Sequence, residues 1–154
     1  MKEFILDICR LFLFGHKSSS ERYVAWLRKQ GVKVGDHTHF YTPWEISVDA
    51  QRPWMIEIGS HVHITMGCTI LQHGYDWAVL QKKYGEVLGS YGKAKIGNNA
   101  FIGQKTIVLK GVQIGDNVIV GAKSLVNRPL APNGVYVGVQ RCLCVGKTTG
   151  KWGG

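Results

Sequence analysis

Aliphatic residues return at every sixth position through the second half of the chain. From residue 96 to residue 126 the sequence reads IGNNAF, IGQKTI, VLKGVQ, IGDNVI and VGAKSL, followed by Val126. A small or β-branched residue stands four places after each aliphatic one: Ala100, Thr106, Val112, Val118 and Ser124. A period of six fits neither the 3.6-residue period of a helix nor the alternation of a long strand. We therefore predict a repeat architecture, in which short parallel strands form coils and the aliphatic residues stack inside.

The same register extends toward the N-terminus, with one interruption. Ile58, Ile64 and Ile70 keep the six-residue spacing, and counting back from Ile58 gives Arg52, then the aliphatic or aromatic residues Ile46, Phe40 and Val34. Arg52 is followed by Pro53, which breaks the inward pattern, so we expect the first coil to be irregular.

A long segment interrupts the coils after His73. The next clear marker after Ile70 is Ile96, and the interval between these two positions is not a multiple of six. We therefore expect residues 74–93 to form a loop that leaves the stack and returns near Lys95. Long loops in compact domains are usually functional, and this aromatic-rich one could cover a substrate or reach a neighbouring subunit.

The coil pattern is predicted to stop at Pro129 and Pro132. Val135, Val137 and Val139 then alternate like a last strand. We expect a single domain of coils at 34–145 and a flexible polar tail at 146–154.

The N-terminal segment, 1–33, is predicted to be helical. Phe4, Ile5, Ile8, Leu11 and Phe12 fall on one helical stripe. Residues 1–15 either cap the open end of the coil stack, which we favour, or lie on a membrane surface.

A second helix is expected directly afterwards. The serines at 18–20 followed by Glu21 are typical of a helix N-terminus, and Gly31 is typical of a helix end.

Charge indicates an anionic partner. The 19 Lys and Arg residues exceed the 10 Asp and Glu residues and give a net charge of +9. A membrane surface, an acidic saccharide, the phosphates of a cofactor or a nucleic acid would fit. No nucleic-acid recognition motif accompanies the charge, so we do not expect nucleic-acid binding. No convincing secretory signal opens the chain, and a cytoplasmic location with reduced thiols is the expectation.

Neither the cysteines nor the histidines indicate a metal site. The four cysteines lack paired CxxC spacing, and Cys68 stands at a small-residue position inside the coils. The histidines at 37 and 39 and those at 61 and 63 form two pairs that each share a strand face. The pairs are separated by four sixes, whereas one regular coil consists of three, so we expect them on different faces and no metal bound.

Three stretches resemble a known family. The repeat as a whole, with IGDNVIVGAKSLV, ILQHGYDW and VDAQRPWMIEIG, resembles the hexapeptide-repeat acyltransferases, and within them the O-acetyltransferases of cell-surface saccharides. The resemblance covers roughly residues 23–143. It implies an all-β fold, a left-handed parallel β-helix with an N-terminal helical cap, a homotrimer, and acetyl-CoA as co-substrate without a metal.

By this resemblance, His73 is the general base. It stands where the coil breaks, at a position that a rigid scaffold can hold in solvent. It would take the proton from an acceptor hydroxyl, whose oxygen attacks the acetyl-CoA thioester directly. A hydrogen-bonded loop histidine without a catalytic role is the alternative.

The group that orients His73 stays open. Family members often place an acidic residue directly after this histidine, but Gly74 follows here. We favour Asp76, with Asp49, Glu57 or a backbone carbonyl as alternatives. Asp76 and its neighbours Tyr75 and Trp77 are also candidates for binding the acceptor.

The resemblance also implies a cofactor path between two subunits. The pantetheine arm would pass Gly103, Gly121, Ala122 and Lys123, and basic side chains would meet the phosphates: Lys105, Lys123, Arg128 and Arg141. In place of the family's usual Gly-Asn-Pro-Ala-Lys ending, residues 138–142 read GVQRC, so that the Asn, Pro and Lys are all replaced.

Two functions from different classes follow. The first is an acetyl-CoA-dependent O-acetyltransferase acting on a saccharide. The alternative, favoured by the changed ending, is a non-catalytic β-helix module that binds a glycan or protein partner. The sequence does not identify the sugar or the hydroxyl that accepts the acyl group. It also leaves open an amine as acceptor and an acyl group other than acetyl.

Overall fold

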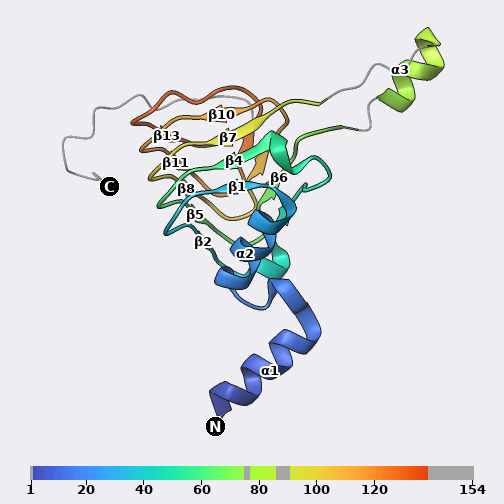
Figure 1. Ribbon diagram of the computed structural model, residues 1–154. Helices are drawn as coiled ribbons and strands as arrows, with labels where there is room; N and C mark the ends of the chain where they lie inside the picture. Colours follow the sequence, from blue (N-terminus) through green and yellow to red (C-terminus); the bar gives the residue numbers. More distant parts are fainter. Residues whose placement is uncertain (1, 75–76, 86–90, 139–154) are drawn as a thin grey trace.

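The computed structural model describes residues 2–74, 77–85 and 91–138, as three helices and a stack of short strands (Figure 1). The helices are α1 (Lys2–Phe14), α2 (Ser20–Gln30) and α3 (Trp77–Tyr84), with 3-10 turns at Gly15–Lys17, Pro43–Glu45 and Pro53–Met55. The strands that precede the projecting segment are β1 (Lys33–Val34), β2 (His39–Phe40), β3 (Ser47–Val48), β4 (Ile56–Ile58), β5 (His63–Ile64) and β6 (Thr69–Ile70). Those that follow are β7 (Ala94–Ile96), β8 (Phe101–Ile102), β9 (Ile107–Val108), β10 (Gln113–Ile114), β11 (Ile119–Val120), β12 (Leu125–Val126) and β13 (Val135–Tyr136).

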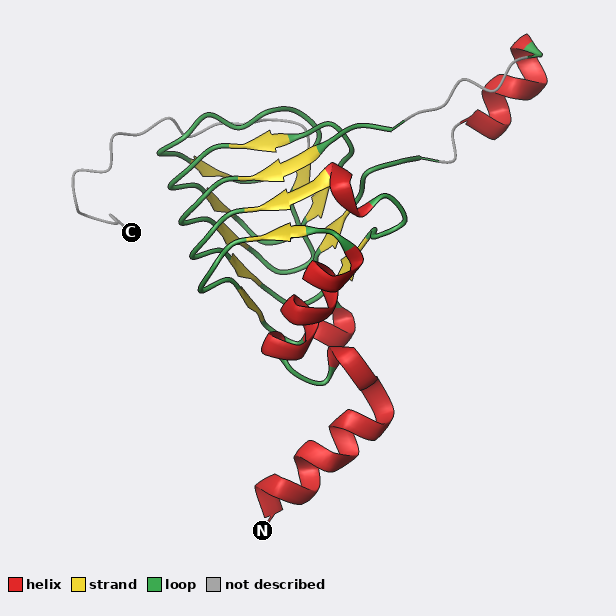
Figure 2. Cartoon of the chain, viewed as in Figure 1, coloured by secondary structure: helices red, strands yellow, loops and turns green. Residues whose placement is uncertain are grey.

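The strands form three parallel sheets, one on each side of a prism (Figure 2). The first sheet has the order β1-β4-β7-β10, the second β2-β5-β8-β11-β13 and the third β3-β6-β9-β12. We call the turns from first to second sheet the first corner, those from second to third the second corner, and those from third back to first the third corner. The predicted parallel β-helix is confirmed.

The predicted inward positions form the core. All the aliphatic or aromatic residues that follow the six-residue register outside Arg52 are buried: Val34, Phe40, Ile46, Ile58, Ile64, Ile70, Ile96, Ile102, Val108, Ile114, Val120 and Val126. The small residues four places on are buried as well, from Ala100 to Ser124. Because each inward side chain is stacked between those of adjacent coils, burial of apolar area is shared along the whole stack.

The first coil is longer than a regular coil of three sixes, which corrects the expectation for the histidines. Strand pairing joins Lys33 to Glu57, four sixes further along, whereas Lys95 pairs with Gln113, three sixes further along. The 3-10 turns at 43–45 and 53–55 take up the added length. The two histidine pairs are therefore stacked rather than on different faces. The rings of His37 and His61 lie 4.8 Å apart, centroid to centroid.

At the other end, the predicted last strand forms beyond the prolines as β13. Val135 of β13 pairs with Ile119 of β11. Leu130 is buried, forms a bridge with Ile114, and donates its N–H to the carbonyl of Gln113 at 2.9 Å. The six-residue pattern ends at the prolines, as predicted, since Ile119 pairs with Val135, 16 residues further along and not 18. A shortened turn nevertheless brings Leu130 back into the stack.

Helix α2 caps the first coil. The Ser19 hydroxyl accepts a hydrogen bond from the Arg22 N–H at the start of α2, and Gly31 ends the helix with φ 104°. Tyr23 and Leu27 are buried, and the ring of Tyr23 meets that of Phe40 edge-on at 5.0 Å. The helix predicted after the serines is confirmed.

Helix α1 does not act as the predicted cap. It extends away from the coils at the end of the stack where α2 lies (Figure 1). Its ring contact with the body is at its last residue, where Phe14 stacks on Trp44 at 5.2 Å. The prediction fails because α2 already covers the first coil. Within the described residues, no helix is long and apolar enough to cross a membrane.

The segment at 74–93 leaves the stack at the third corner and carries α3 at its far end (Figure 2). Sequence reasoning expected a loop there and missed the helix. The last strand predicted from Val135 is confirmed as β13, whereas Val139, Cys142, Cys144 and the tail predicted at 146–154 lie outside the described residues.

Replacing Ile102 by Ala should lower the free energy of unfolding by about 2–5 kcal/mol, because it removes a fully buried side chain from the middle coil. Urea denaturation monitored by circular dichroism measures this. Val79 of α3 is 73% exposed, so Val79→Ala serves as the control and should change stability by less than about 0.5 kcal/mol. Equal effects of the two substitutions would contradict the stacked core.

Candidate functional site

His73 lies at the third corner, where the chain leaves the coils. It forms an antiparallel bridge with Tyr91, at the point where the segment returns. The N–H of Gly92 donates to the carbonyl of Gln72 at 2.9 Å, which closes the base of the projecting segment. His73 is thus held where the projecting segment leaves the coils, beside the chain that returns. It is only partly exposed, with 17% of its side chain accessible.

Asp49 contacts the His73 ring from the coil below. Its Oδ2 lies against Nδ1 of His73, and only 10% of its side chain is exposed. Backbone N–H groups of Gln51 and Gln72 approach the same carboxylate at 3.3 and 3.5 Å. A carboxylate accepts and cannot donate, so the geometry assigns the Nδ1 proton to His73 and leaves Nε2 as the basic nitrogen.

Gln72 adds a second contact to the ring. The residue is buried, and its Nε2 lies 3.1 Å from Nδ1 of His73. Its Oε1 is a buried oxygen without a hydrogen-bond partner among the described residues. The carboxylate and the amide, both removed from bulk water, thus converge on Nδ1, and with the proton on Nδ1 the amide nitrogen packs there without accepting a hydrogen bond.

The other carboxylates considered for this role have different positions. Glu57 is held by Lys93 at 2.8 Å and Lys95 at 3.4 Å. The hydrogen bond from Lys93 is the largest cause that lowers the pKa of Glu57. Asp76, which the sequence favoured, lies outside the described residues, as does Tyr75. Asp49 is the carboxylate that the structure brings to His73.

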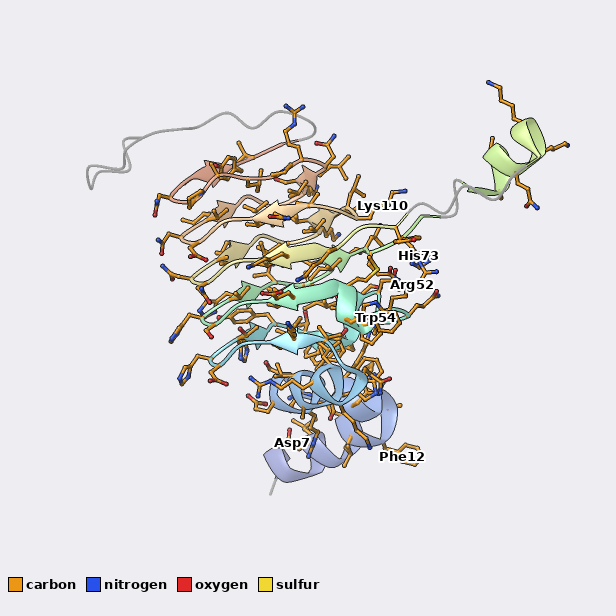
Figure 3. All side chains as sticks on the ribbon, turned by 45° about the horizontal axis from the view of Figure 1, so that its top comes forward. Asp7, Phe12, Arg52, Trp54, His73 and Lys110 are labelled. Carbon is orange, nitrogen blue, oxygen red and sulfur yellow. The ribbon has the colours of Figure 1, made fainter. Side chains whose placement is uncertain are left out.

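Large side chains line the edge around His73. Figure 3 shows Lys110, His73, Arg52 and Trp54 along the same edge of the prism. Trp54 is 67% exposed, and the guanidinium carbon of Arg52 lies 4.8 Å from the centre of the Tyr91 ring. Sequence reasoning missed this surface, because the 3-10 turn at 53–55 that presents Trp54 has no place in the six-residue register.

Most of the predicted cofactor residues lie elsewhere, at the second corner. Gly103 and Gly121 occupy equivalent turns of adjacent coils, where a Cβ on Gly103 would lie 2.5 Å from the backbone nitrogen of Ala122. Glycine is therefore required there by the close approach of two coils. Lys123 follows with φ 56°, in the left-handed region, and Lys105 has φ 57° at the equivalent place below.

The backbone N–H groups of this corner differ in their partners. Those of Gly103, Gly121 and Lys123 donate to carbonyls of neighbouring coils or turns, at 2.7–2.8 Å. For the N–H of Ala122, an exposed residue, no such acceptor occurs among the described residues. Because Gly103 has no side chain, no Cβ lies against this nitrogen.

The remaining predicted residues are separated from this corner. Arg128 follows β12 at the third corner, and Trp77 begins α3. Arg141 lies outside the described residues. In a single chain, the corner of His73 and that of Ala122 are therefore different edges of the prism.

Cys68 is a packing residue, as predicted. It is fully buried, and its thiol donates to the carbonyl of Gly103 at 3.1 Å. Burial raises the pKa of the Cys68 thiol. A nucleophilic role, which needs an accessible thiolate, is therefore disfavoured.

Among the described residues, no group of three or more metal-binding side chains is positioned to hold a metal ion.

Comparison with known proteins agrees with the repeat. Residues 93–128 match the family described as bacterial transferase hexapeptide (six repeats). Protein CapG of Staphylococcus aureus is 40% identical over 111 residues, which cover 62% of this chain and 63% of CapG. Galactoside O-acetyltransferase of Escherichia coli (strain K12) is 32% identical over 109 residues, covering 71% of this chain and 52% of that enzyme. The chain thus spans between about half and two-thirds of the length of these curated relatives.

A solved structure shows the same architecture. The maltose O-acetyltransferase from Clostridium difficile 630 aligns with a TM-score of 0.52 at 26% sequence identity, over 86% of this chain and 78% of that one. The winding is the left-handed one that the resemblance implied. By its repeat, its relatives and its fold, the chain belongs to the hexapeptide-repeat transferase family.

Proposed function

We propose that this protein is an acetyltransferase that moves an acetyl group from acetyl-CoA to a hydroxyl of a saccharide, with His73 as general base. The observation that carries the proposal is the contact between Asp49 and Nδ1 of His73 at the edge of the coils. A histidine with one nitrogen fixed by a buried carboxylate is oriented to accept a proton at the other.

The proposed reaction proceeds by direct attack. Nε2 of His73 takes the proton from the acceptor hydroxyl while the hydroxyl oxygen forms a bond to the thioester carbonyl carbon. The tetrahedral intermediate then expels the CoA thiolate, which accepts that proton from the imidazolium. Asp49 stabilises the imidazolium that exists between these steps, as a buried carboxylate does beside a catalytic histidine. No group on the enzyme is acylated, so Cys68 needs no role.

The donor is proposed to lie along the second corner. The N–H of Ala122, for which no backbone acceptor occurs among the described residues, suits a carbonyl of the pantetheine arm or the oxyanion of the intermediate. Gly103 and Gly121 allow the arm to approach the backbone. Lys105 and Lys123 are exposed at this corner and would meet the phosphates, and the same role is proposed for Arg128 and Arg141.

A homotrimer would bring the two corners together. The outer face of the first sheet is polar, with Lys33, Glu57, Lys95 and Gln113 in register. The outer faces of the other two sheets carry exposed apolar residues instead, namely Phe101, Ile107 and Ile119. A monomer would leave these apolar side chains in water. We therefore propose that the second and third sheets face neighbouring subunits, so that His73 of one chain serves a donor bound at the second corner of another.

The saccharide acceptor rests on the relatives and on the edge around His73. The names of the E. coli and C. difficile relatives specify a galactoside and maltose as acceptors. The exposed indole of Trp54 and the Tyr91 ring would offer apolar surface to a sugar, with Arg52 as hydrogen-bond donor. Tyr75, Asp76 and Trp77 remain candidates for acceptor contacts from the projecting segment.

Replacing His73 by Ala should lower kcat at least about 100-fold, since the proton acceptor is lost. Asp49→Asn should also lower kcat, by a smaller factor, because an amide cannot stabilise the imidazolium charge. The rate of CoA thiol release, with a galactoside and with maltose as acceptors, gives kcat for both variants. Glu57→Gln is the matched control, because this carboxylate binds Lys93 and Lys95 instead. Near-normal turnover of His73→Ala would remove the residue from the mechanism.

Replacing Lys123 by Ala should raise the KM for acetyl-CoA about tenfold or more while kcat stays within a few fold, because a charge-assisted contact to a phosphate is lost. Initial rates at varied acetyl-CoA concentration separate the two constants. Lys82→Ala, an exposed lysine of α3, is the control. An unchanged KM would place the donor away from the second corner.

A further inference from the structure

Helix α1 exposes several large apolar side chains at once. Leu6 is 54% exposed, Leu11 45%, Phe12 90% and Leu13 71%. Elsewhere among the described residues, exposed hydrophobic side chains are spread over the strands, turns and α3. The ring contacts of α1 with the body are made by Phe14 and Arg10, which lie against Trp44, and the four exposed side chains take no part in them.

These four side chains surround most of the helix. At 100° per residue, Leu11, Phe12, Leu13 and Leu6 spread over an arc of roughly 220°. The polar remainder, about 140° wide, contains Asp7 and Arg10, which approach each other to 3.8 Å. A helix that packs on a protein core shows a much narrower apolar stripe, of about 100° or somewhat more. The arc is therefore wider than one partner helix would cover.

An arc of this width fits a helix that is partly immersed in a lipid surface. The acyl boundary then surrounds the apolar sides at the same time, and the polar strip faces water. The charge of the protein adds to this fit, because a net charge of +9 attracts a surface of anionic headgroups. Helix α1 itself is neutral, because Lys2 and Arg10 are balanced by Glu3 and Asp7, so this attraction comes from the rest of the chain.

We propose that α1 docks this protein on a membrane surface that contains anionic lipid. Phe12 and Leu13 enter the acyl boundary, and Asp7 and Arg10 stay in the headgroup layer. Figure 3 shows Phe12 and Asp7 on the end of the molecule beyond Trp54, while Lys110 and His73 lie on the far side of Trp54. Docking through α1 therefore leaves the third-corner edge accessible, and the proposal does not depend on the reaction assigned to His73.

The test is co-sedimentation of the full chain with vesicles. Vesicles of phosphatidylcholine mixed with phosphatidylglycerol should bind the protein, and vesicles of phosphatidylcholine alone should bind it more weakly. Raised salt should weaken binding, because it screens the headgroup charge. Phe12→Asp should reduce the partition coefficient at least about tenfold, since it replaces a large apolar contact by a charge.

The control is Val79→Asp, which places the same charge on an exposed apolar position of α3. This variant should bind the mixed vesicles like the unmodified chain. Equal binding of Phe12→Asp and the unmodified chain would overturn the proposal, as would failure of the unmodified chain to bind. A lower mass of Phe12→Asp by light scattering, without vesicle binding by either protein, would instead show that a second copy covers α1. Circular dichroism confirms that each variant is folded.

Discussion

The stacking of one inward aliphatic residue on its equivalent in the next coil is the interaction on which the rest of the molecule depends. Ile64 pairs in register with Ile102, and Ile102 with Val120, so each coil is positioned by its neighbours. No coil buries its apolar side chains alone, which makes the fold cooperative along its axis. The corners inherit their positions from this register.

Conformational strain in the stack falls at the corners, where the candidate functional residues also lie. At the first corner, the third residue of successive turns adopts a left-handed conformation, at His37, His61, Asn99 and Asn117. Asn99 and Asn117 offset this by a hydrogen bond between their side chains at 2.8 Å. At the second corner the same conformation falls on Lys105 and Lys123. Asparagine adopts this conformation readily, whereas lysine does so rarely, so the two lysines are unusual at these positions.

The periodic part of the fold could be predicted from the sequence because each residue in it repeats a local rule. The inward register from Ile96 to Val126 and the buried position of Cys68 follow from spacing alone. The length of the first coil could not be predicted in the same way, since a six-residue count does not show the turns at 43–45 and 53–55. That omission caused the error over the stacking of His37 and His61.

The same omission affected the candidate site. Strand pairing sets Ser47 opposite Thr69, so Asp49 falls close to the turn that carries His73. Spacing in sixes does not show this, and proximity in sequence favoured Asp76 instead. His73 itself was found because it marks the break in the register. The course of α1 could not be predicted, because an apolar stripe on a helix does not specify what covers it.

The central claim is that this β-helix uses acetyl-CoA. The most direct measurement is titration of the purified protein with acetyl-CoA in a calorimeter, before any acceptor is chosen. The account predicts saturable binding in the micromolar range, about 8 kcal/mol at the usual standard state, with one site per chain. Absence of binding would contradict it and would favour the non-catalytic module, because the changed sequence at 138–142 would then have removed the donor site.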